Sequence, residues 1–186
     1  MASAFTHGFL ALSMGKTFFR EGMPPKFWMF SLLCSVLPDM DVYGFYLGTA
    51  YGSLWGHRGF THSLFFAFLL SVVIMNFGYR EYGPFTPSWW KLWVFFFFLA
   101  SSHGVLDAMT SGGFGVAFFS PFAPTRYSLP WTPLIISPLG LDTFFTSWGR
   151  KVIWSEITWV WLPSILIWGV LQAVRIFHSR HIHRKN

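Results

Sequence analysis

Five apolar stretches alternate along the chain with short segments rich in glycine, proline and charged residues. The apolar stretches cover residues 5–19, 27–37, 62–79, 92–109 and 157–177. About 20 apolar residues in a helix cross the hydrocarbon core of a bilayer, which is about 30 Å thick. The fifteen residues of the first stretch rise only about 22 Å. The pattern therefore predicts an all-α membrane bundle with about four full spans and one short N-terminal helix.

Composition supports this assignment. Hydrophobic residues make up 53% and charged residues 11% of the chain, whereas soluble domains carry roughly 25% charged residues. The 24 Phe and 11 Trp suit a lipid-facing surface and its two interfaces. The single cysteine, Cys34, excludes an intramolecular disulfide and suits a small buried side chain. The length fits one domain, residues 1–186, which ends in a basic tail at 178–186.

The positions of Lys and Arg predict which helix ends face the cytoplasm. The basic tail places the C-terminus inside, and the basic turns around residues 16–26 and 80–91 then fall on the same side. Five membrane segments satisfy this rule when the N-terminus lies outside. The exceptions on the outer side all belong to the long loop at 110–155: Arg126, Arg150 and Lys151. No basic stripe suggests nucleic-acid binding, so the expected partner is the lipid bilayer.

Acidic residues and histidines are scarce, with seven of each, yet many fall where this topology brings helix ends together on the non-cytoplasmic face. These residues are His7, Asp39, Asp41, His57, His62, His103 and Asp107. Imidazole and carboxylate together suit Zn²⁺, Mn²⁺ or Fe²⁺. The sequence thus predicts a divalent metal site, most simply for zinc, with one or two ions.

The spacing of these residues along the chain indicates which of them are direct metal ligands and which lie beside the ligands. His103 and Asp107 are four residues apart, so they share one helix face. Asp39 follows a helix C-terminus, where two acids repel each other unless a cation is bound. We expect Asp39 to be the direct ligand and Asp41 to orient a histidine or to bridge a second ion. Either His57 or His62 is then a ligand, and the other histidine forms a hydrogen bond or transfers protons.

Further residues are candidates for catalysis around the metal. Asp41, His57 and Glu156 are predicted to transfer protons. For Glu156 two alternatives stay open: it is another metal ligand, or it is a carboxylate that only stabilises the N-terminus of the last helix. Arg58 is predicted to clamp an anionic oxygen, with a lipid headgroup contact as the alternative. Arg126 is expected to face the site. Capping of helix N-termini is predicted for Thr6 and for Thr61 or Ser63, and the tail histidines are better explained as a cytoplasmic anchor: His178, His181 and His183.

The reaction class follows partly by elimination. The chain has no Gly-x-Ser-x-Gly elbow, no P-loop and no dinucleotide fingerprint. A metal held by His and Asp lowers the pKa of bound water towards about 7. The sequence therefore predicts a metal-dependent hydrolase that uses activated water on a phosphoester, such as a phospholipid or lipid-linked phosphate. The alternatives are an ion or metal transporter and a non-catalytic membrane protein with a structural metal.

The motifs resemble the YdjM-like family of bacterial inner-membrane proteins, described as LexA-binding or LexA-regulated metal-dependent hydrolases. The resemblance covers about residues 5–160 and rests on a histidine at 7, LPDMD at 37–41, GHRGFTHS at 56–63, SH at 102–103 and DAMT at 107–110. It implies a membrane-bound hydrolase in the bacterial inner membrane.

The same order of residues is similar, more distantly, to zinc-dependent phospholipase C and P1 nuclease. That likeness implies zinc ligands at His7, Asp39, His62 or His57, His103 and Asp107, with Asp107 as a bridge between two ions. A later His-x-x-x-Glu pattern of those enzymes is missing here, which implies one or two ions instead of three.

Overall fold

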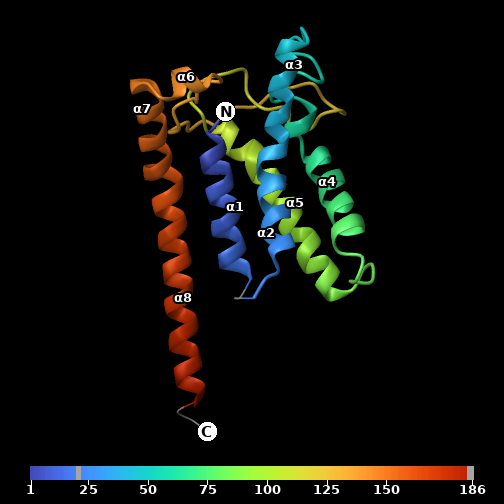
Figure 1. The fold of residues 1–186 in the computed structure, drawn as a ribbon, viewed down its shortest axis with the longest axis vertical. Helices are drawn as coiled ribbons and strands as arrows, with labels where there is room; N and C mark the ends of the chain where they lie inside the picture. Colours follow the sequence, from blue (N-terminus) through green and yellow to red (C-terminus); the bar gives the residue numbers. More distant parts are fainter. Residues whose placement is uncertain (20–21, 184–186) are drawn as a thin grey trace.

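The computed structural model describes residues 1–19 and 22–183. Five long helices lie side by side and alternate in direction (Figure 1). They are α1 (Ala4–Phe18), α2 (Pro25–Val36), α4 (Leu64–Gly78), α5 (Pro87–Ala108) and α8 (Leu162–His183). The described residues contain no β-strand, only two isolated bridges. The prediction of an all-α fold is confirmed.

Short elements connect these helices at the end of the bundle where the N-terminus lies (Figure 1). They are the 3₁₀ turn η1 (Leu37–Val42), α3 (Tyr43–Tyr46), the 3₁₀ turn η2 (Phe60–His62), α6 (Leu141–Phe144) and α7 (Ser147–Glu156). A π-helical turn, η3 (Ile157–Trp161), joins α7 to α8 without a break. The last helix therefore begins ten residues earlier than the apolar stretch that predicted it.

The predicted number of full spans is not confirmed. Among the described residues, one helix is long and apolar enough to cross a membrane, Ser147–His178. The reason is helix length: α1 and α4 have 15 residues and α2 has 12, so they rise only about 18 to 22 Å. Several predicted basic residues lie outside the described residues, namely Arg20, Arg184 and Lys185, as do the side chains of Arg180, His181 and His183.

Side-chain caps fix where several helices begin. Ser63 caps α4 by accepting a 3.0 Å hydrogen bond from the Phe66 amide, which confirms one of the two residues predicted there. At α1 the cap is Ser3, and Thr6 is the residue whose amide donates to it. The prediction of Thr6 as the cap was wrong, because the helix begins before the apolar stretch does.

Aromatic side chains fill the core between α1, α2, α4 and α5. Phe27 stacks on Phe95 with ring centroids 5.0 Å apart, and Phe96 is fully buried beside them. Cys34 is also fully buried, with its thiol against the Phe96 carbonyl, as the sequence predicted. The ring of Phe30 packs directly on the backbone of Gly78, where a Cβ would lie 2.4 Å from the ring.

Helix α8 packs along α1 on the outside of this core. Trp161 stacks on Phe9 with ring centroids 4.7 Å apart. At the other end of the contact, the Arg175 guanidinium donates a 2.6 Å hydrogen bond to the Thr17 carbonyl. The short helix α1 is thus held at both ends by the long one, and most of α8 remains exposed.

Replacing Phe96 by alanine should lower the free energy of unfolding by about 3 kcal/mol, since a fully buried ring leaves a cavity. The matched control is Phe98→Ala, two residues on, where the ring is 58% exposed and the loss should be small. Thermal unfolding of both variants in the same detergent measures the difference. Equal losses would contradict this description of the core.

Candidate metal centre

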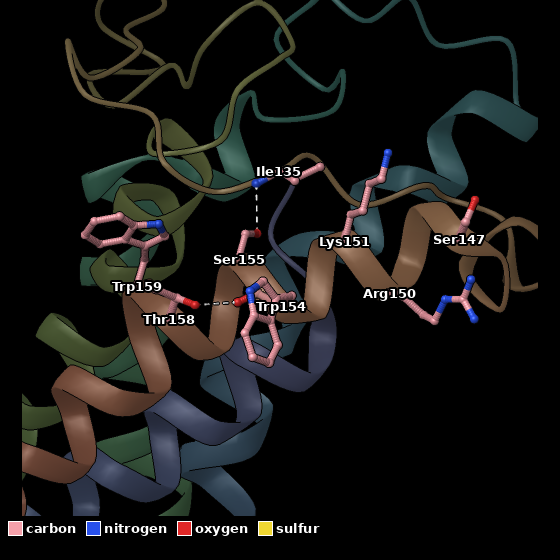
Figure 2. A pocket seen from close by; sticks show the side chains of 8 residues that line it. All are labelled: Ile135, Ser147, Arg150, Lys151, Trp154, Ser155, Thr158 and Trp159. Atoms are coloured by element: carbon pink, nitrogen blue, oxygen red, sulfur yellow. Dashed lines mark hydrogen bonds between the residues drawn. The ribbon is translucent and has the colours of Figure 1, made fainter.

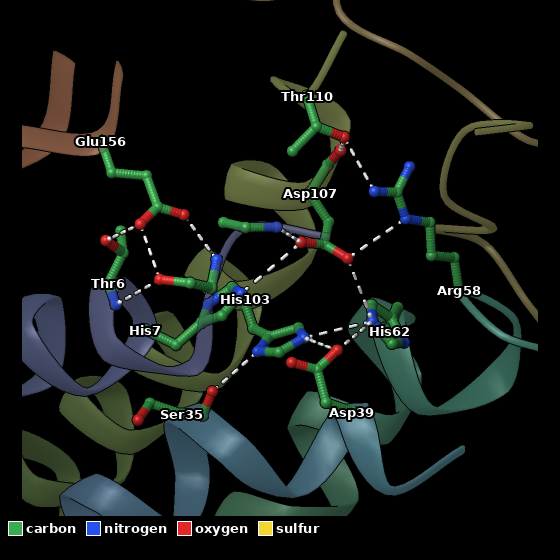
Figure 3. Close-up of polar contacts among 12 residues, drawn as sticks. Thr6, His7, Ser35, Asp39, Arg58, His62, His103, Asp107, Thr110 and Glu156 are labelled. Atoms are coloured by element: carbon green, nitrogen blue, oxygen red, sulfur yellow. Dashed lines mark hydrogen bonds and ion pairs between the residues drawn. The ribbon is translucent and has the colours of Figure 1, made fainter. Parts of the chain in front are cut away.

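Polar side chains from distant parts of the chain meet at one end of the bundle (Figure 3). Helix α1 contributes His7 near its start, η1 contributes two aspartates after α2 ends, and α5 contributes His103 and Asp107 in its last turns. The segment between α3 and α4 contributes His57, Arg58 and His62. The structure therefore brings together the predicted helix ends.

Four of these residues, Asp39, His62, His103 and Asp107, each place a ligand atom within 4.8 Å of the others. His62 Nε2 lies 3.1 Å from His103 Nε2 and 3.4 Å from Asp107 Oδ2. Asp39 Oδ1 lies 3.6 Å from His62 Nε2 and 3.3 Å from His103 Nε2. Ligands bonded to zinc at 2.0–2.1 Å in a tetrahedron are about 3.3 Å apart. The spacing therefore matches a tetrahedral site.

Hydrogen bonds set the tautomers of both histidines. His103 Nδ1 lies 2.7 Å from the Ser35 carbonyl, which can only accept, so this nitrogen carries the proton. His62 Nδ1 lies 3.1 Å from Asp41 Oδ2, and the same argument applies. In the neutral rings, both Nε2 atoms therefore present lone pairs to each other at 3.1 Å. A cation between them removes this repulsion.

Buried carboxylate oxygens without a hydrogen-bond partner lie in the same four-residue group. Asp39 Oδ1, Asp39 Oδ2 and Asp107 Oδ2 are buried and have no hydrogen-bond donor among the described residues. A buried polar atom without a partner costs about 1–3 kcal/mol. Burial raises the pKa of Asp39, whereas positive charge and hydrogen bonds at His103 and His62 lower it below its ordinary value, so positive charge at these rings, from a proton or a metal ion, favours the ionised carboxylate. Two imidazole nitrogens and the carboxylate oxygens of Asp39 and Asp107 that lack a hydrogen-bond donor fit a divalent metal, while the other Asp107 oxygen accepts from the Ala2 amide at 2.7 Å.

Asp41 is an acceptor for several donors around this group. Its Oδ1 lies 2.7 Å from His57 Nδ1, and its Oδ2 accepts from the Thr61 hydroxyl at 2.6 Å and the Arg58 amide at 3.1 Å. Burial would raise the pKa of Asp41, but hydrogen bonds from His57 and His62 hold it below its ordinary range. Asp41 thus orients His62 in the way that carboxylates orient metal-bound histidines.

Asp41, His57 and His62 form a second group whose ligand atoms also lie within 4.8 Å of one another. His62 belongs to both groups, but its Nδ1 donates to Asp41 and only Nε2 is free for a metal. His57 lies outside the four-residue group. The geometry therefore favours His62 as the ligand, and His57 as its neighbour through Asp41.

Arg58 is fully buried and adopts a left-handed backbone conformation, with φ of 62°. Its Nε lies 3.2 Å from Asp107 Oδ2, and its terminal nitrogens donate to the Gly112 carbonyl and the Thr110 hydroxyl. The structure thus turns the guanidinium towards Asp107 and the protein. Strain of this kind gathers at functional sites.

Arg126 approaches the same segment from the long loop. Its guanidinium donates to the His57 carbonyl at 2.9 Å and to the Tyr51 carbonyl at 2.8 Å. Gly56 lies between these two residues, and a Cβ there would be 2.2 Å from the Tyr51 carbonyl oxygen. Arg126 therefore holds the backbone that carries His57, and its side chain does not enter the four-residue group.

The structure places Glu156 beside the centre and outside both ligand groups (Figure 3). Its carboxylate accepts from the Ser3 amide at 2.5 Å, the Ser3 hydroxyl at 2.6 Å and the Thr6 hydroxyl at 2.8 Å. Trp161 Nε1 donates to the same Thr6 oxygen at 2.7 Å. Glu156 thus anchors the start of α1.

His7 follows directly in α1 and lies against the four-residue group. Its ring stacks on that of His103 with centroids 3.8 Å apart, and its Nε2 lies 3.5 Å from Asp107 Oδ1. Three further residues contribute to the site without having been predicted as site residues, Ser3, Ser35 and Thr110, the last of which ends the DAMT motif. Ser35 acts through a backbone carbonyl, which no residue pattern reports, whereas a serine before α1 is a recognisable cap.

Together the fold and the site define a helical membrane protein with a buried His–Asp centre. The family model described as "YdjM inner membrane protein" matches residues 1–181. The chain is also 37% identical over 171 residues to "Inner membrane protein YbcI" of Escherichia coli (strain K12), a match that covers 92% of this chain and 97% of that protein. No solved structure matches. The chain belongs to the YdjM inner membrane protein family, which confirms the resemblance to that family; the likeness to phospholipase C stays a prediction.

His103→Ala should reduce the bound divalent metal from about one ion per chain to almost none, because it removes one of four ligands. His178→Ala is the matched control, since that histidine is exposed near the C-terminus. Elemental analysis of protein purified without chelators measures both variants. Full metal content in His103→Ala would contradict the assignment of this centre.

Glu156→Gln should lower the free energy of unfolding by about 1–3 kcal/mol, because an amide group cannot accept all three hydrogen bonds. The metal content at saturating metal should persist. Thermal unfolding and elemental analysis of the same preparation separate the two effects. A fully stable variant that has lost its metal would show that Glu156 is a ligand.

Proposed function

We propose that this protein is a membrane-bound, metal-dependent hydrolase that acts on a phosphoester of a phospholipid or a lipid-linked phosphate. One observation carries the proposal: the Nε2 atoms of His62 and His103 face each other at 3.1 Å beside carboxylate oxygens that have no hydrogen-bond donor among the described residues. Zinc is the favoured ion, because nitrogen and oxygen ligands at tetrahedral spacing suit it. Manganese and iron accept the same ligands.

The proposed topology has five membrane segments, α1, α2, α4, α5 and α8, and the centre on the non-cytoplasmic side. Basic residues support it. The end of the bundle away from the centre carries exposed or partly exposed cations: Lys16, Lys26, Arg80, Lys91 and Arg175. At the opposite end, Arg58 and Arg126 are engaged by Asp107 and by backbone carbonyls, and Arg150 and Lys151 are the exposed exceptions. This asymmetry fits a cytoplasmic C-terminus.

Each ligand has a role in this proposal. His62, His103, Asp39 and Asp107 would hold the metal, which supplies Lewis acidity and lowers the pKa of water. Asp39 has the most exposed side chain of the four, at 9%, so substrate would approach from its side. Arg58 balances the charge of Asp107 and fixes its orientation.

His57 and Asp41 would handle protons. The 2.7 Å contact between His57 Nδ1 and the Asp41 carboxylate fixes the orientation of the ring and leaves its other nitrogen available to accept a proton. The His57 ring centroid lies 5.5 Å from that of His62. His57 and Asp41 thus lie next to the proposed metal ligand His62 and outside the four-residue group.

The depth of the centre supports a lipid substrate. It lies at helix ends, where a membrane protein meets the headgroup layer. Large apolar side chains at the same end are exposed, including Trp55 at 61% and Phe114 at 75%. Exposed aromatic residues at this level suit contact with the membrane interface, so a headgroup phosphate would come close to the centre.

A structural metal is the second candidate. All four ligands are buried, and four protein ligands to zinc are typical of structural sites. The metal would then tie η1, η2 and α5 together without turnover. The two candidates differ in what happens when His57 is changed, because His57 is outside the four-residue group.

The test uses purified, metal-loaded protein and vesicles of defined phospholipids, with phosphate and phosphomonoester release as the readout. His57→Gln should lower the rate by about 10²- to 10⁴-fold while metal content and melting temperature persist. His178→Ala is the control and should match the unchanged protein. Chelation should abolish turnover.

Absence of turnover by metal-loaded protein across the panel, with unfolding on chelation, would support the structural metal instead. Equal rates for His57→Gln and the unchanged protein would remove His57 from the mechanism. Absence of bound metal, with no affinity on titration, would end both candidates.

A further inference from the structure

A hollow lies where α7 passes into α8, and none of the residues of the metal centre lines it (Figure 2). Its volume is about 630 Å³. The residues that line it include Arg150, Lys151, Trp154, Thr158 and Trp159. Ser155 closes its inner side by accepting a 3.1 Å hydrogen bond from the Ile135 amide. The hollow therefore lies on the outer surface of the helix.

This hollow is positively charged. Arg150 and Lys151 line it, no acidic residue does, and neither forms an ion pair with another residue in the part of the chain that the structure describes. The nearest acid along the helix, Glu156, is turned towards Ser3 and Thr6. Both cations therefore remain free to meet an anion.

These two residues are also the unexplained part of the charge distribution. Positive residues are expected on the cytoplasmic side of short connections, and Arg150 and Lys151 lie at the other end. Arg126 is accounted for by its bonds to the Tyr51 and His57 carbonyls. An anionic partner at the membrane surface would account for the remaining pair.

The depth of the residues along the helix suits a lipid headgroup. Helix Ser147–His178 is the candidate span, and its most apolar part is only 6% buried inside the protein. The backbones of Lys151 and Arg150 lie about 9 and 10.5 Å along the axis before Ile157, where the apolar stretch begins, so their long side chains reach back to the headgroup layer. The headgroup layer on each side of a bilayer is about 5–8 Å thick. Trp154 and Trp159 then lie at the boundary where Trp is enriched.

We propose that this hollow binds the headgroup of an anionic phospholipid of the surrounding membrane. Arg150 and Lys151, whose side chains leave the helix in different directions (Figure 2), supply positive charge on two sides of the headgroup phosphate, since basic pockets of membrane proteins recognise such headgroups. The indoles of Trp154 and Trp159 pack against the glycerol and the first acyl carbons. In the sequence, Thr158 lies between these two tryptophans. The site fixes the depth of α7 in the membrane and does not depend on the proposed hydrolase activity.

The experiment compares retention of phosphatidylglycerol and phosphatidylcholine by the full-length protein, using native mass spectrometry from detergent at fixed lipid concentrations. We expect the protein to retain phosphatidylglycerol preferentially. The double variant Arg150→Ala/Lys151→Ala should weaken this binding by roughly 10- to 30-fold, as expected for the loss of two cations. Metal content should be unchanged, which shows that the variant is folded.

The matched control is Lys16→Ala/Arg80→Ala, which removes the same charge from the opposite end of the bundle and should leave binding within twofold. Equal retention of the two lipids, or equal losses in both double variants, would overturn the proposal. Displacement of phosphatidylglycerol by millimolar inorganic phosphate would also overturn it, because the hollow would then be a site for a soluble anion.

Discussion

The arrangement of the centre depends on one hydrogen-bonded carboxylate, that of Asp41. It holds the Nδ1 proton of His62, the ring of His57, the Thr61 hydroxyl and the Arg58 amide. Because His62 is fixed in this tautomer, its free nitrogen can only face His103, whose own proton is committed to a backbone carbonyl. Two lone pairs that cannot turn away from each other create a demand for positive charge. The fold therefore places two imidazole nitrogens where a proton on one ring or a metal ion between them supplies that charge.

Much of this centre could be predicted from the sequence, because chemistry-bearing residues are rare in an apolar chain. His103 and Asp107 share a helix face by simple periodicity, and the scarcity of acids made Asp39 conspicuous. The choice between His57 and His62 could not be made, since it depends on which ring reaches His103 across 41 positions of sequence. Likewise, the role of Ser35 as a carbonyl acceptor leaves no trace in residue type.

The fold was predicted less completely, and helix length explains the difference. Apolar stretches located five helices, yet the helix that ends the chain begins at Ser147, within a segment whose Arg150 and Lys151 suggested a loop. Its start is set by the Thr146 cap, a local signal that a search for apolar runs overlooks. Conversely, Glu156 was conspicuous as an isolated acid, but its partners Ser3 and Thr6 lie 150 or more positions away, beyond any local pattern.

The π-helical turn at Ile157–Trp161 has a consequence for the register of the last helix. Glu156 and Trp161 both contact the hydroxyl of Thr6, although residues five apart in a regular α-helix point about 140° away from each other. The wider turn accommodates one additional residue per turn. Regular α-helical winding of the same five residues would rotate α7 by about 90° relative to α8. Loss of one residue here would instead restore regular winding with little rotation, so a one-residue difference in chain length at this point would leave the two halves of the helix facing the same neighbours.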